Sequence, residues 1–263
     1  MPEAMRLEQR FLERSHAFPG PEKLAREAER LEGVAPERIL EWALGIYGEK
    51  LTLSVSFGNP EGMVLLDMLN RIVREAEDAP RVGVFTLDTG FLFEETVRFR
   101  EEAMQRYASL PLEVIRPNLT VAEQVALYGE ELYSCKPDIC CQIRKVEPQE
   151  RALEGYEAWV TGIRRDQTPQ RAGTPVVRWE ERFKVTKIAP LASWDEARIE
   201  EYVQEHEVPL NPLLSMGYRS IGCEPCTRPV SPGENARAGR WSMMDKTECG
   251  LHFVDGVVRR AVS

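Results

Sequence analysis

The chain has 263 residues and a mass of 30.0 kDa, so it is long enough for one large domain or two small ones around a sizeable buried core. Hydrophobic residues make up 43% and charged residues 29% of the sequence, as in average soluble domains, and no apolar run approaches the roughly 18 residues of a membrane span. Because the formal net charge of −9 at pH 7 repels phosphate, broad nucleic-acid binding is excluded along with disorder and membrane insertion.

The first half of the chain predicts strands that alternate with helices. Residues 1–50 contain two helices, expected near 21–31 and 36–47, the second entered by a proline suited to the first helical position. Strands are then expected at 51–57, 81–87 and 112–116, and helices at 63–73, at 91–107 and from near Thr120. This alternation predicts an α/β fold, a Rossmann-like parallel sheet with helices on both faces.

The second half is less regular. We expect a helix at 133–154, a strand at 156–161, a hairpin with outward basic positions at 176–188, and a helix at 193–205 capped by Ser193. From residue 209 the sequence is rich in Pro, Gly and Arg, which indicates a loop-built segment. The chain is therefore divided into N-terminal helices (1–50), an α/β nucleotide-binding core with the first cysteine pair (51–208) and a C-terminal segment (209–263).

Two polar turns follow the first two predicted strands. Ser54 and Ser56 offer hydroxyl groups to an oxyanion, and Gly58 allows backbone amides to approach it. Backbone groups of Thr86 and Leu87 are candidates for reading an adenine edge at the same side of the sheet. No Walker-type or G-x-G-x-x-G string is present, so a plain strand-to-helix connection is the alternative to a nucleotide site.

Residues 161–187 reverse the charge of the chain. Seven basic side chains stand against three acidic ones there: Arg164, Arg165, Arg171, Arg178, Arg182, Lys184 and Lys187 against Asp166, Glu180 and Glu181. The segment is either a local anion site or the solvated face of a hairpin.

The cysteines carry the strongest inorganic signal. Two pairs, Cys140 with Cys141 and Cys223 with Cys226, provide a four-thiolate set for a [4Fe-4S] cluster or zinc. Adjacent cysteines are awkward for structural zinc, so their spacing favours the cluster, with buried unligated thiols as the remaining alternative. Cys135 is expected to be a bystander. Because the start of the sequence lacks a secretory signal, we expect a cytoplasmic protein with reduced thiols rather than three disulfides.

Cys249 stands apart from both pairs and is either inert packing or a nucleophile. Arg237, Arg240 and Lys246 lie nearby in the sequence and would favour a thiolate and attract an anionic substrate. His252 is close enough in sequence to influence the thiol, although a structural role fits it equally well.

Several strings together resemble the assimilatory sulfonucleotide reductases, specifically the iron–sulfur branch that reduces adenosine 5′-phosphosulfate. The matching strings begin at Ser54 (S-V-S-F-G), Leu87 (L-D-T-G), Cys140 (C-C-Q-I-R-K-V-E-P), Thr161 (T-G-I-R-R-D-Q), Ile221 (I-G-C-E-P-C-T-R-P), Arg237 (R-A-G-R-W) and Glu248 (E-C-G-L-H). They run in family order over about 200 residues, and the double-cysteine and E-C-G-L-H strings are highly specific. The resemblance implies an adenine nucleotide alpha hydrolase-like fold.

The same resemblance implies a mechanism and a set of site residues. Cys249 is expected to attack the sulfur of the phosphosulfate, release AMP and form an S-sulfocysteine that thioredoxin or a similar dithiol protein resolves to sulfite. Cys140, Cys141, Cys223 and Cys226 are expected to hold one [4Fe-4S] cluster per chain, which orders the site near Lys145. The expected substrate-binding residues are Ser54, Ser56, Gly58, Thr86, Leu87, Lys145, Arg164, Arg165, Asp166, Arg171, Arg237 and Arg240.

Three other functions stay open at this point. The 3′-phosphorylated substrate, phosphoadenosine phosphosulfate, can undergo the same chemistry, although four cluster cysteines favour the unphosphorylated one. A tRNA-sulfurating enzyme would carry a Ser-Gly-Gly-x-Asp-Ser loop, which is absent from this sequence, and a more basic surface. A zinc-stapled or cluster-stapled nucleotide-binding protein without catalysis is the third. We expect no nucleic-acid or membrane partner, and homo-oligomerisation is left open.

Overall fold

The computed structural model describes residues 20–76, 78, 80–242, 244, 246 and 248–251. Two helices come first, α2 (Pro21–Leu31) and α3 (Pro36–Tyr47), each with a proline in its first turn. The short 3₁₀ turn η1 (Gly48–Lys50) leads from α3 into the first strand. Both helices have the bounds expected from the sequence, because proline is tolerated where the helical N–H has no partner.

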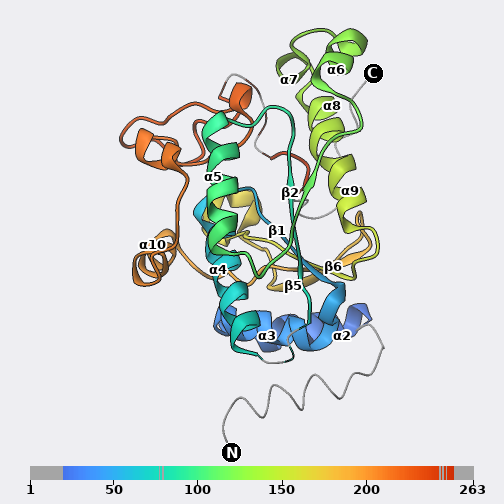
Figure 1. Cartoon of the computed structure of the whole chain (residues 1–263), viewed down its shortest axis with the longest axis vertical. Helices are drawn as coiled ribbons and strands as arrows, with labels where there is room; N and C mark the ends of the chain where they lie inside the picture. The colour runs from blue at the N-terminus through green and yellow to red at the C-terminus, as the bar shows by residue number, and fades with distance from the viewer. Residues whose placement is uncertain are drawn as a thin grey trace, which may run out of the picture.

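A six-stranded sheet forms the centre of the molecule (Figure 1). Its order is β3-β2-β1-β4-β6-β5, and all neighbouring pairs are parallel except the β5–β6 hairpin at one edge. The strands are β1 (Leu51–Ser54), β2 (Gly83–Leu87), β3 (Leu112–Ile115), β4 (Ala158–Val160), β5 (Val177–Glu180) and β6 (Val185–Ile188). The predicted parallel α/β sheet is therefore confirmed. The carboxyl ends of β1, β2 and β4 meet at one edge, where such sheets bind ligands.

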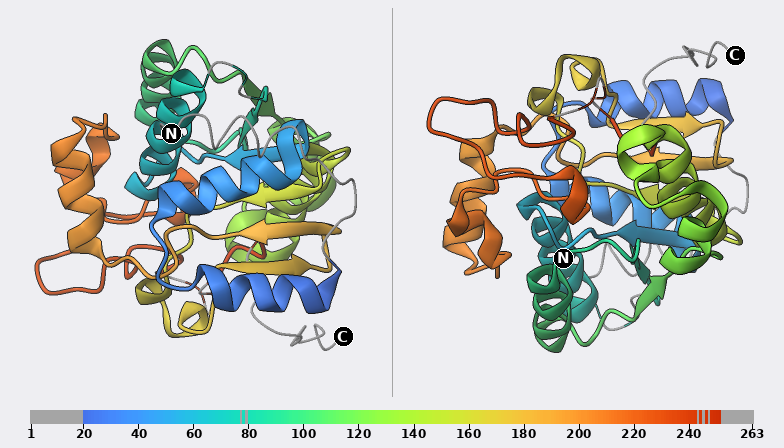
Figure 2. Two further views of the ribbon diagram at one scale, coloured as in Figure 1. Left: turned by 90° about the horizontal axis from the view of Figure 1, so that it is seen from below. Right: turned by 90° about the horizontal axis from the view of Figure 1, so that it is seen from above.

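Helices pack on both faces of the sheet (Figures 1 and 2). One side carries α4 (Pro60–Glu75), α5 (Glu94–Arg106) and α10 (Glu196–Glu205), with α10 against α4. On the other side α9 (Glu147–Leu153) contacts β2 and β3 and continues from α6 (Val121–Tyr128), α7 (Leu132–Cys135), α8 (Pro137–Cys141) and the π-helix η2 (Gln142–Val146). The remaining 3₁₀ turns are η3 (Arg165–Gln167), η4 (Pro169–Arg171), η5 (Pro212–Met216) and η6 (Glu224–Cys226).

Side-chain alternation along the strands divides the interior into two cores. Leu53 of β1 and Val160 of β4 belong to the larger core with α2, α3, α4 and α10. Their sheet neighbours Phe85 and Trp159 point to the opposite face and pack with Val146 and Leu153. Because successive residues of a strand point to opposite faces, both faces of this short-stranded sheet are buried.

Two expectations for the helices need correction. The region expected as one helix at 133–154 is helical at Leu132–Cys135 and from Pro137 to Leu153, but it breaks at Lys136 before Pro137 and contains the π-helix η2. The N-cap of α10 is Asp195 rather than Ser193, since the Asp195 carboxylate accepts a hydrogen bond from the Arg198 N–H at 2.9 Å. A carboxylate directly before the first helical residue satisfies an amide that Ser193 lies too early to reach.

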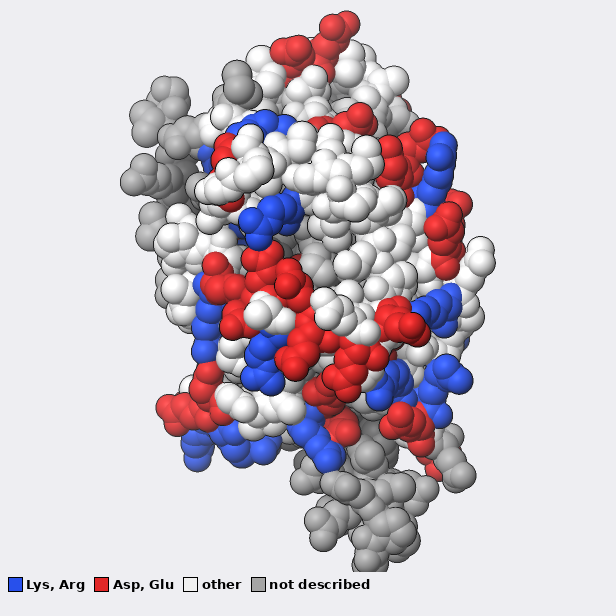
Figure 3. All heavy atoms as spheres, turned by 90° about the vertical axis from the view of Figure 1, so that its left-hand side faces the viewer, with Lys and Arg blue, Asp and Glu red and all other residues white. Residues whose placement is uncertain are grey.

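The surface view of Figure 3 looks onto the side of the molecule where α5 and α10 lie. Acidic side chains gather in the middle of this face, with separate Lys and Arg side chains around them. Within the described part of the chain, no helix has both the length and the apolar character needed to cross a membrane.

Candidate active site

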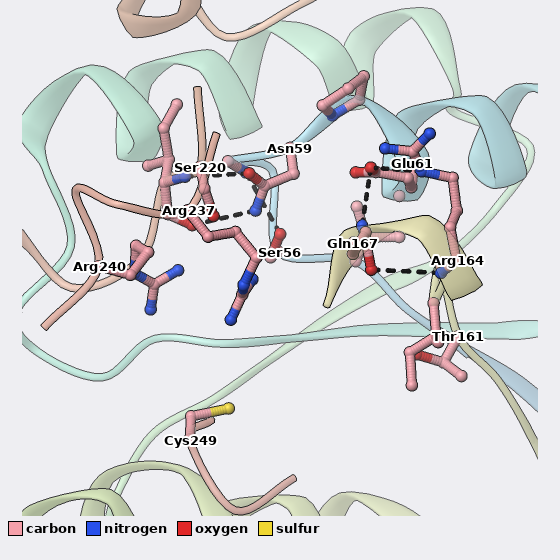
Figure 4. Close-up of a pocket in the computed structure, with 18 of the residues that line it drawn as sticks. Ser56, Asn59, Glu61, Thr161, Arg164, Gln167, Ser220, Arg237, Arg240 and Cys249 are labelled. Atoms are coloured by element: carbon pink, nitrogen blue, oxygen red, sulfur yellow. Dashed lines mark hydrogen bonds and ion pairs between the residues drawn. The ribbon is translucent and has the colours of Figure 1, made fainter. Parts of the chain in front are cut away.

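A cleft of about 710 Å³ opens where β1, β2 and β4 end. Its walls come from the turns after these strands, from α9 and from the C-terminal segment. Figure 4 shows Ser56 and Asn59 on one side, Arg237 and Arg240 beside them, and Cys249 across the cavity. Segments more than 190 residues apart thus meet at one edge of the sheet.

The wall nearest the sheet combines hydroxyl groups with an indole. Trp159 of β4 donates from Nε1 to the Ser54 Oγ at 2.7 Å, and its ring packs edge-on against Phe183 at 5.7 Å between centroids. Thr86 and Leu87 at the end of β2 also line the cleft. This wall therefore presents backbone and hydroxyl groups that a buried indole holds in place, an arrangement suited to a base and its ribose.

The turn after β1 is fastened to the C-terminal segment rather than left open. Asn59 donates from Nδ2 to the Ile221 carbonyl at 3.0 Å and accepts from the Ile221 N–H at 2.9 Å. A Cβ on Gly58 would lie 3.0 Å from the Ile221 Cβ. The absence of a side chain at Gly58 therefore lets the C-terminal segment pack closely on this turn, and Asn59 is a site residue that the sequence did not single out.

Cations converge on the opposite wall. The Arg240 guanidinium stacks over the Trp241 ring at 4.4 Å, and the Lys145 Nζ lies 5.9 Å from the same ring centroid. Burial lowers the pKa of Arg237 to about 10, with Arg171 and Arg240 contributing in the same direction. Gly222 permits this packing, because a Cβ there would lie 2.2 Å from the Arg240 Nη2. The result is a preorganised positive pocket of the kind that stabilises an anion in a low-dielectric site.

Cys249 lies within this positive field. Burial on its own raises the pKa of the Cys249 thiol, but Lys145, the Leu251 backbone N–H and Arg240 act in the other direction, and the net pKa lies below the ordinary value. For Lys145, burial favours a lower pKa, yet Cys223, Cys249 and Cys141 outweigh it and leave the pKa above its usual value. A thiol with a lowered pKa beside a retained cation is the arrangement expected of a nucleophile.

A buried ionic network joins the start of α4 to Glu248 in the C-terminal segment, whose residues 248–251 are called the tail below. Glu61 Oε1 accepts from Gln167 Nε2 at 2.8 Å and from Arg164 Nε at 3.1 Å, as drawn in Figure 4. Gln167 Oε1 in turn accepts from Arg171, whose Nε and Nη2 donate to Glu248 at 2.8 and 2.7 Å. Glu61, Gln167 and Glu248 were missed as site residues. Glu61 and Glu248 are long-range partners of arginines, and Gln167 joins Arg171 to the distant Glu61, so a linear sequence does not reveal these contacts.

The four paired cysteines line one small cavity. Cys140 and Cys141 come from α8, while Cys223 directly precedes η6 and Cys226 is its last residue. Burial followed by the neighbouring thiols raises the pKa of Cys140 to about 12, and burial and Cys223 raise that of Cys226 to about 11. Thiolates of Cys140 and Cys226 would therefore be favoured by a bound positive centre. Among the described residues, no group of three or more His, Cys, Asp or Glu side chains is close enough to hold a single metal ion.

Polar side chains surround this cysteine cavity. Thr89 Oγ1 lies 3.3 Å from the Cys223 Sγ, and the Gln124 Nε2 lies 4.0 Å from the Cys140 Sγ. Arg144 holds Gln124 at 2.6 Å and donates to the Leu119 and Thr120 carbonyls, each at 2.8 Å. Because Lys145, Cys223 and Trp241 line both cavities, the cysteine cavity and the cleft share a wall.

The cleft brings together most of the residues expected to bind substrate. It is lined by Ser54, Ser56, Gly58, Thr86, Leu87, Lys145, Arg164, Asp166, Arg171, Arg237, Arg240 and Cys249. Arg165 does not line it, because its guanidinium forms a two-point ion pair with Glu32, directly after α2, at 2.6 and 2.7 Å. The expected role of Arg165 in substrate binding is therefore withdrawn in favour of packing α2 against the core.

The basic segment at 161–187 is not simply a solvated face of a hairpin. Three of its basic side chains, Arg164, Arg171 and Lys187, are buried. Cys135 is exposed and lies outside the cysteine cavity. His252 lies outside the described residues.

Comparison with known proteins gives this geometry a family. The model of the phosphoadenosine phosphosulfate reductase domain matches residues 50–229. The chain belongs to this family. A phosphoadenosine 5′-phosphosulfate reductase of Gloeobacter violaceus is 46% identical over 86% of this chain and 91% of its own length. An adenosine 5′-phosphosulfate reductase of Halalkalibacterium halodurans is 46% identical over 81% and 90%, and one of Streptomyces coelicolor is 44% identical over 86% and 92%.

Solved structures agree on the fold. A phosphoadenylyl-sulfate reductase from Candida auris, solved with phosphate, superposes with a TM-score of 0.69 at 28% identity, covering 81% of this chain and 99% of its own. An FMN adenylyltransferase from Candida glabrata has a TM-score of 0.56 at 17% identity, covering 86% and 73%. The expected adenine nucleotide alpha hydrolase-like fold is confirmed.

Proposed function

We infer that this chain reduces adenosine 5′-phosphosulfate to sulfite and AMP in assimilatory sulfate reduction, with thioredoxin or a similar dithiol protein as reductant. One observation carries the chemistry: the half-buried Cys249 lies across the cleft from Arg237 and Arg240 (Figure 4), within the electrostatic influence of Lys145. A thiol and three cations around a nucleotide-sized cavity match the needs of an anionic sulfur electrophile.

In the first step, the nucleotide binds with its base and ribose along the wall formed by Thr86, Leu87 and Trp159. Its phosphosulfate then lies among Lys145, Arg237 and Arg240. The Cys249 thiolate attacks the sulfur, a Cys249 S–S bond forms, and the bond from that sulfur to the phosphate oxygen breaks. AMP leaves with the electron pair, and the enzyme carries an S-sulfocysteine. The cations stabilise the negative charge that develops on the leaving phosphate while two anions approach each other.

In the second step, a thiolate of the dithiol protein attacks the Cys249 Sγ. Sulfite leaves with the electron pair, and a mixed disulfide forms between the two proteins. The second thiol of the partner then attacks the mixed disulfide, so Cys249 returns as a free thiol and the partner becomes a disulfide. The partner supplies both electrons, and the atoms balance without a redox change in any other group.

The cysteine cavity fits a [4Fe-4S] cluster held by Cys140, Cys141, Cys223 and Cys226. The fit rests on four thiols from two segments that surround one cavity, and on the raised pKa of Cys140 and Cys226, whose ionisation a bound positive centre would favour. Bound there, the cluster would join the two segments and adjust the electrostatic environment of Lys145. In these steps Lys145 itself contacts the reacting groups, because it binds the phosphosulfate and favours the ionised form of Cys249.

The test is Cys249→Ser together with a comparison of substrates. We expect the variant to release no sulfite, because a serine hydroxyl is not ionised at neutral pH, while AMP affinity and iron content stay at wild-type values. Sulfite release by Cys249→Ser at the wild-type rate would refute the role of Cys249. For the wild-type enzyme with reduced thioredoxin, kcat/KM is expected to be higher for adenosine phosphosulfate than for its 3′-phosphorylated form; the reverse order would assign the other substrate.

Metal analysis and visible absorption test the cluster independently. Single serine substitutions of the four paired cysteines should lose iron and brown colour. A colourless protein that contains zinc, or a colourless variant with full activity, would contradict the cluster.

A further inference from the structure

Glu248, the residue directly before the expected nucleophile, is the starting point. Arg171 grips both of its carboxylate oxygens, with Nε to Oε1 at 2.8 Å and Nη2 to Oε2 at 2.7 Å. Oε2 also lies 3.6 Å from Arg237. The side chains of Arg171 and Glu248 are 8% and 17% exposed. A two-point arginine–carboxylate pair of this kind combines energy with a fixed orientation.

Arg171 is itself positioned by a hydrogen bond on the side away from Glu248. Its Nη1 donates to the Oε1 of Gln167, and Gln167 donates to Glu61 at 2.8 Å. Arg164 donates to the same Glu61 oxygen, so the network is anchored at the start of α4. Each of the three guanidinium nitrogens of Arg171 therefore donates to a protein group. Two of them donate to Glu248 and the third donates to Gln167.

A carboxylate at this position is unfavourable for the chemistry itself. It places another negative charge beside the Cys249 thiolate and raises the pKa of that thiol, against the effect of Lys145. It also adds negative charge to a cleft that is proposed to bind an anion. The Glu248–Arg171 ion pair offsets this disadvantage if it attaches the tail in one orientation, which a neutral side chain would do less well.

A second attachment lies on the other side of Cys249. Leu251 packs against the core formed by Phe85, Val146 and Trp159. The Leu251 backbone N–H also donates to Cys249. Cys249 is thus held between a polar contact at Glu248 and an apolar contact at Leu251, so the direction of its thiol depends on both.

We propose that Glu248 is a positioning residue that docks residues 248–251 through its ion pair with Arg171, so that Cys249 faces Lys145 and Arg240. Arg171 then binds the tail, and the substrate anion is left to Lys145, Arg237 and Arg240. The kinetic part of this proposal rests on the proposed function. The docking itself does not, because the ion pair joins two parts of this chain.

The first test needs no substrate. Hydrogen exchange of the peptide that contains residues 248–251 is measured by mass spectrometry in the wild type, Glu248→Gln, Arg171→Gln and the double variant. Each single variant is expected to exchange about tenfold faster or more, the change that a loss of about 1.4 kcal/mol of docking free energy produces. Because the two residues form one contact, the double variant should be no faster than the singles. Unchanged exchange in Glu248→Gln would overturn the proposal.

Glu32→Gln is the matched control. It removes a carboxylate from a two-point pair with Arg165 of nearly the same geometry, but outside the cleft. Exchange at 248–251 should stay at the wild-type rate in this variant. Faster exchange at 248–251 in Glu32→Gln would mean that any lost ion pair loosens the tail, and the specific role of Glu248 would be abandoned.

The second test separates docking from substrate binding. The rate of S-sulfocysteine formation is measured in single turnovers by intact mass, and the dissociation constant of adenosine phosphosulfate is measured in a Cys249→Ser background. We expect Glu248→Gln and Arg171→Gln to slow the covalent step about tenfold or more and to change the dissociation constant less than about twofold. Weaker substrate binding in Arg171→Gln would make Arg171 a substrate ligand, and tighter binding in Glu248→Gln would make Glu248 a competitor of the substrate. Altered exchange without any covalent product would refute the proposed function and leave the docking intact.

Discussion

Lys187 carries a charge beneath the floor of the cleft and permits a quantitative prediction. It lies on β6, is 2% exposed, and its Nζ is 3.2 Å from Glu180 and 4.7 Å from the Trp159 ring centroid. Burial lowers the pKa of Lys187 to about 8, although Glu180 acts in the opposite direction. Replacement of Lys187 by Met removes the titrating group and keeps an unbranched side chain of similar length.

The sign and size of the effect follow from this pKa. The unfolded chain keeps the Lys187 proton up to about pH 10.5, whereas the folded protein releases it near pH 8. Between these values the unfolded state binds more protons, so the free energy of unfolding rises with pH. At about 1.4 kcal/mol for each pH unit, the total rise due to Lys187 is about 3 kcal/mol, and at pH 7 the buried charge costs the fold that amount.

The assay is urea unfolding of the wild type and Lys187→Met from pH 7 to 10.5, followed by tryptophan fluorescence. Cysteines that titrate in this range are present in both proteins, so the difference between the two curves isolates Lys187. We expect the difference in unfolding free energy to change by about 3 kcal/mol over the interval in favour of the wild type as pH rises. Lys184→Met, at an exposed position of the same hairpin, should show no such change. A pH-independent difference for Lys187→Met would refute the reasoning.

Three further predictions concern the cleft and the cysteines. Trp159→Phe removes the donor to Ser54 and should lower the unfolding free energy by about 1 kcal/mol and weaken AMP binding in calorimetric titration; unchanged affinity and stability would contradict this. Gly162→Ala places a Cβ 2.9 Å from the Glu61 Cβ and should cost about 1–3 kcal/mol, seen as a lower melting temperature; an unchanged melting temperature would show that α4 can yield. Cys135→Ser should keep full iron content, because this thiol lies outside the cysteine cavity, and iron loss would make Cys135 a ligand.

Much of the fold could be predicted because local signals and long-range packing agree. The prolines that open α2 and α3 give their first residues directly. The strand runs alternate with amphipathic segments, so the parallel sheet follows. In the 133–154 region the break before Pro137 has a local signal in the proline itself, whereas the π-helix that follows at 142–146 has none that the sequence reveals. The division into three parts at residues 50 and 208 stays a prediction.

The candidate site shows a similar limit. The resemblance of short strings to the sulfonucleotide reductases was sufficient to name Cys249, Lys145 and Arg240 as members of one site, and the structure places all three on the cleft. The partners of those residues were not visible. Asn59 and Ile221 are 162 positions apart. Arg165 and Arg171 are close in sequence, but Arg165 lies outside the cleft and Arg171 lines it, because folding pairs the first with Glu32 and the second with Glu248.

The π-helix η2 has a consequence for how this region can change. A π-turn accommodates one residue more than an α-turn, and each residue of an α-helix rotates the side-chain direction by about 100°. Deletion of one residue between Cys141 and Glu147 would restore a regular helix and turn Lys145 away from the cleft or the cysteines away from their cavity. The number of residues in this segment is therefore constrained more tightly than their identity. Insertions and deletions should be tolerated in the exposed turn near Gly233, where a side chain would meet nothing within 4 Å, but not here.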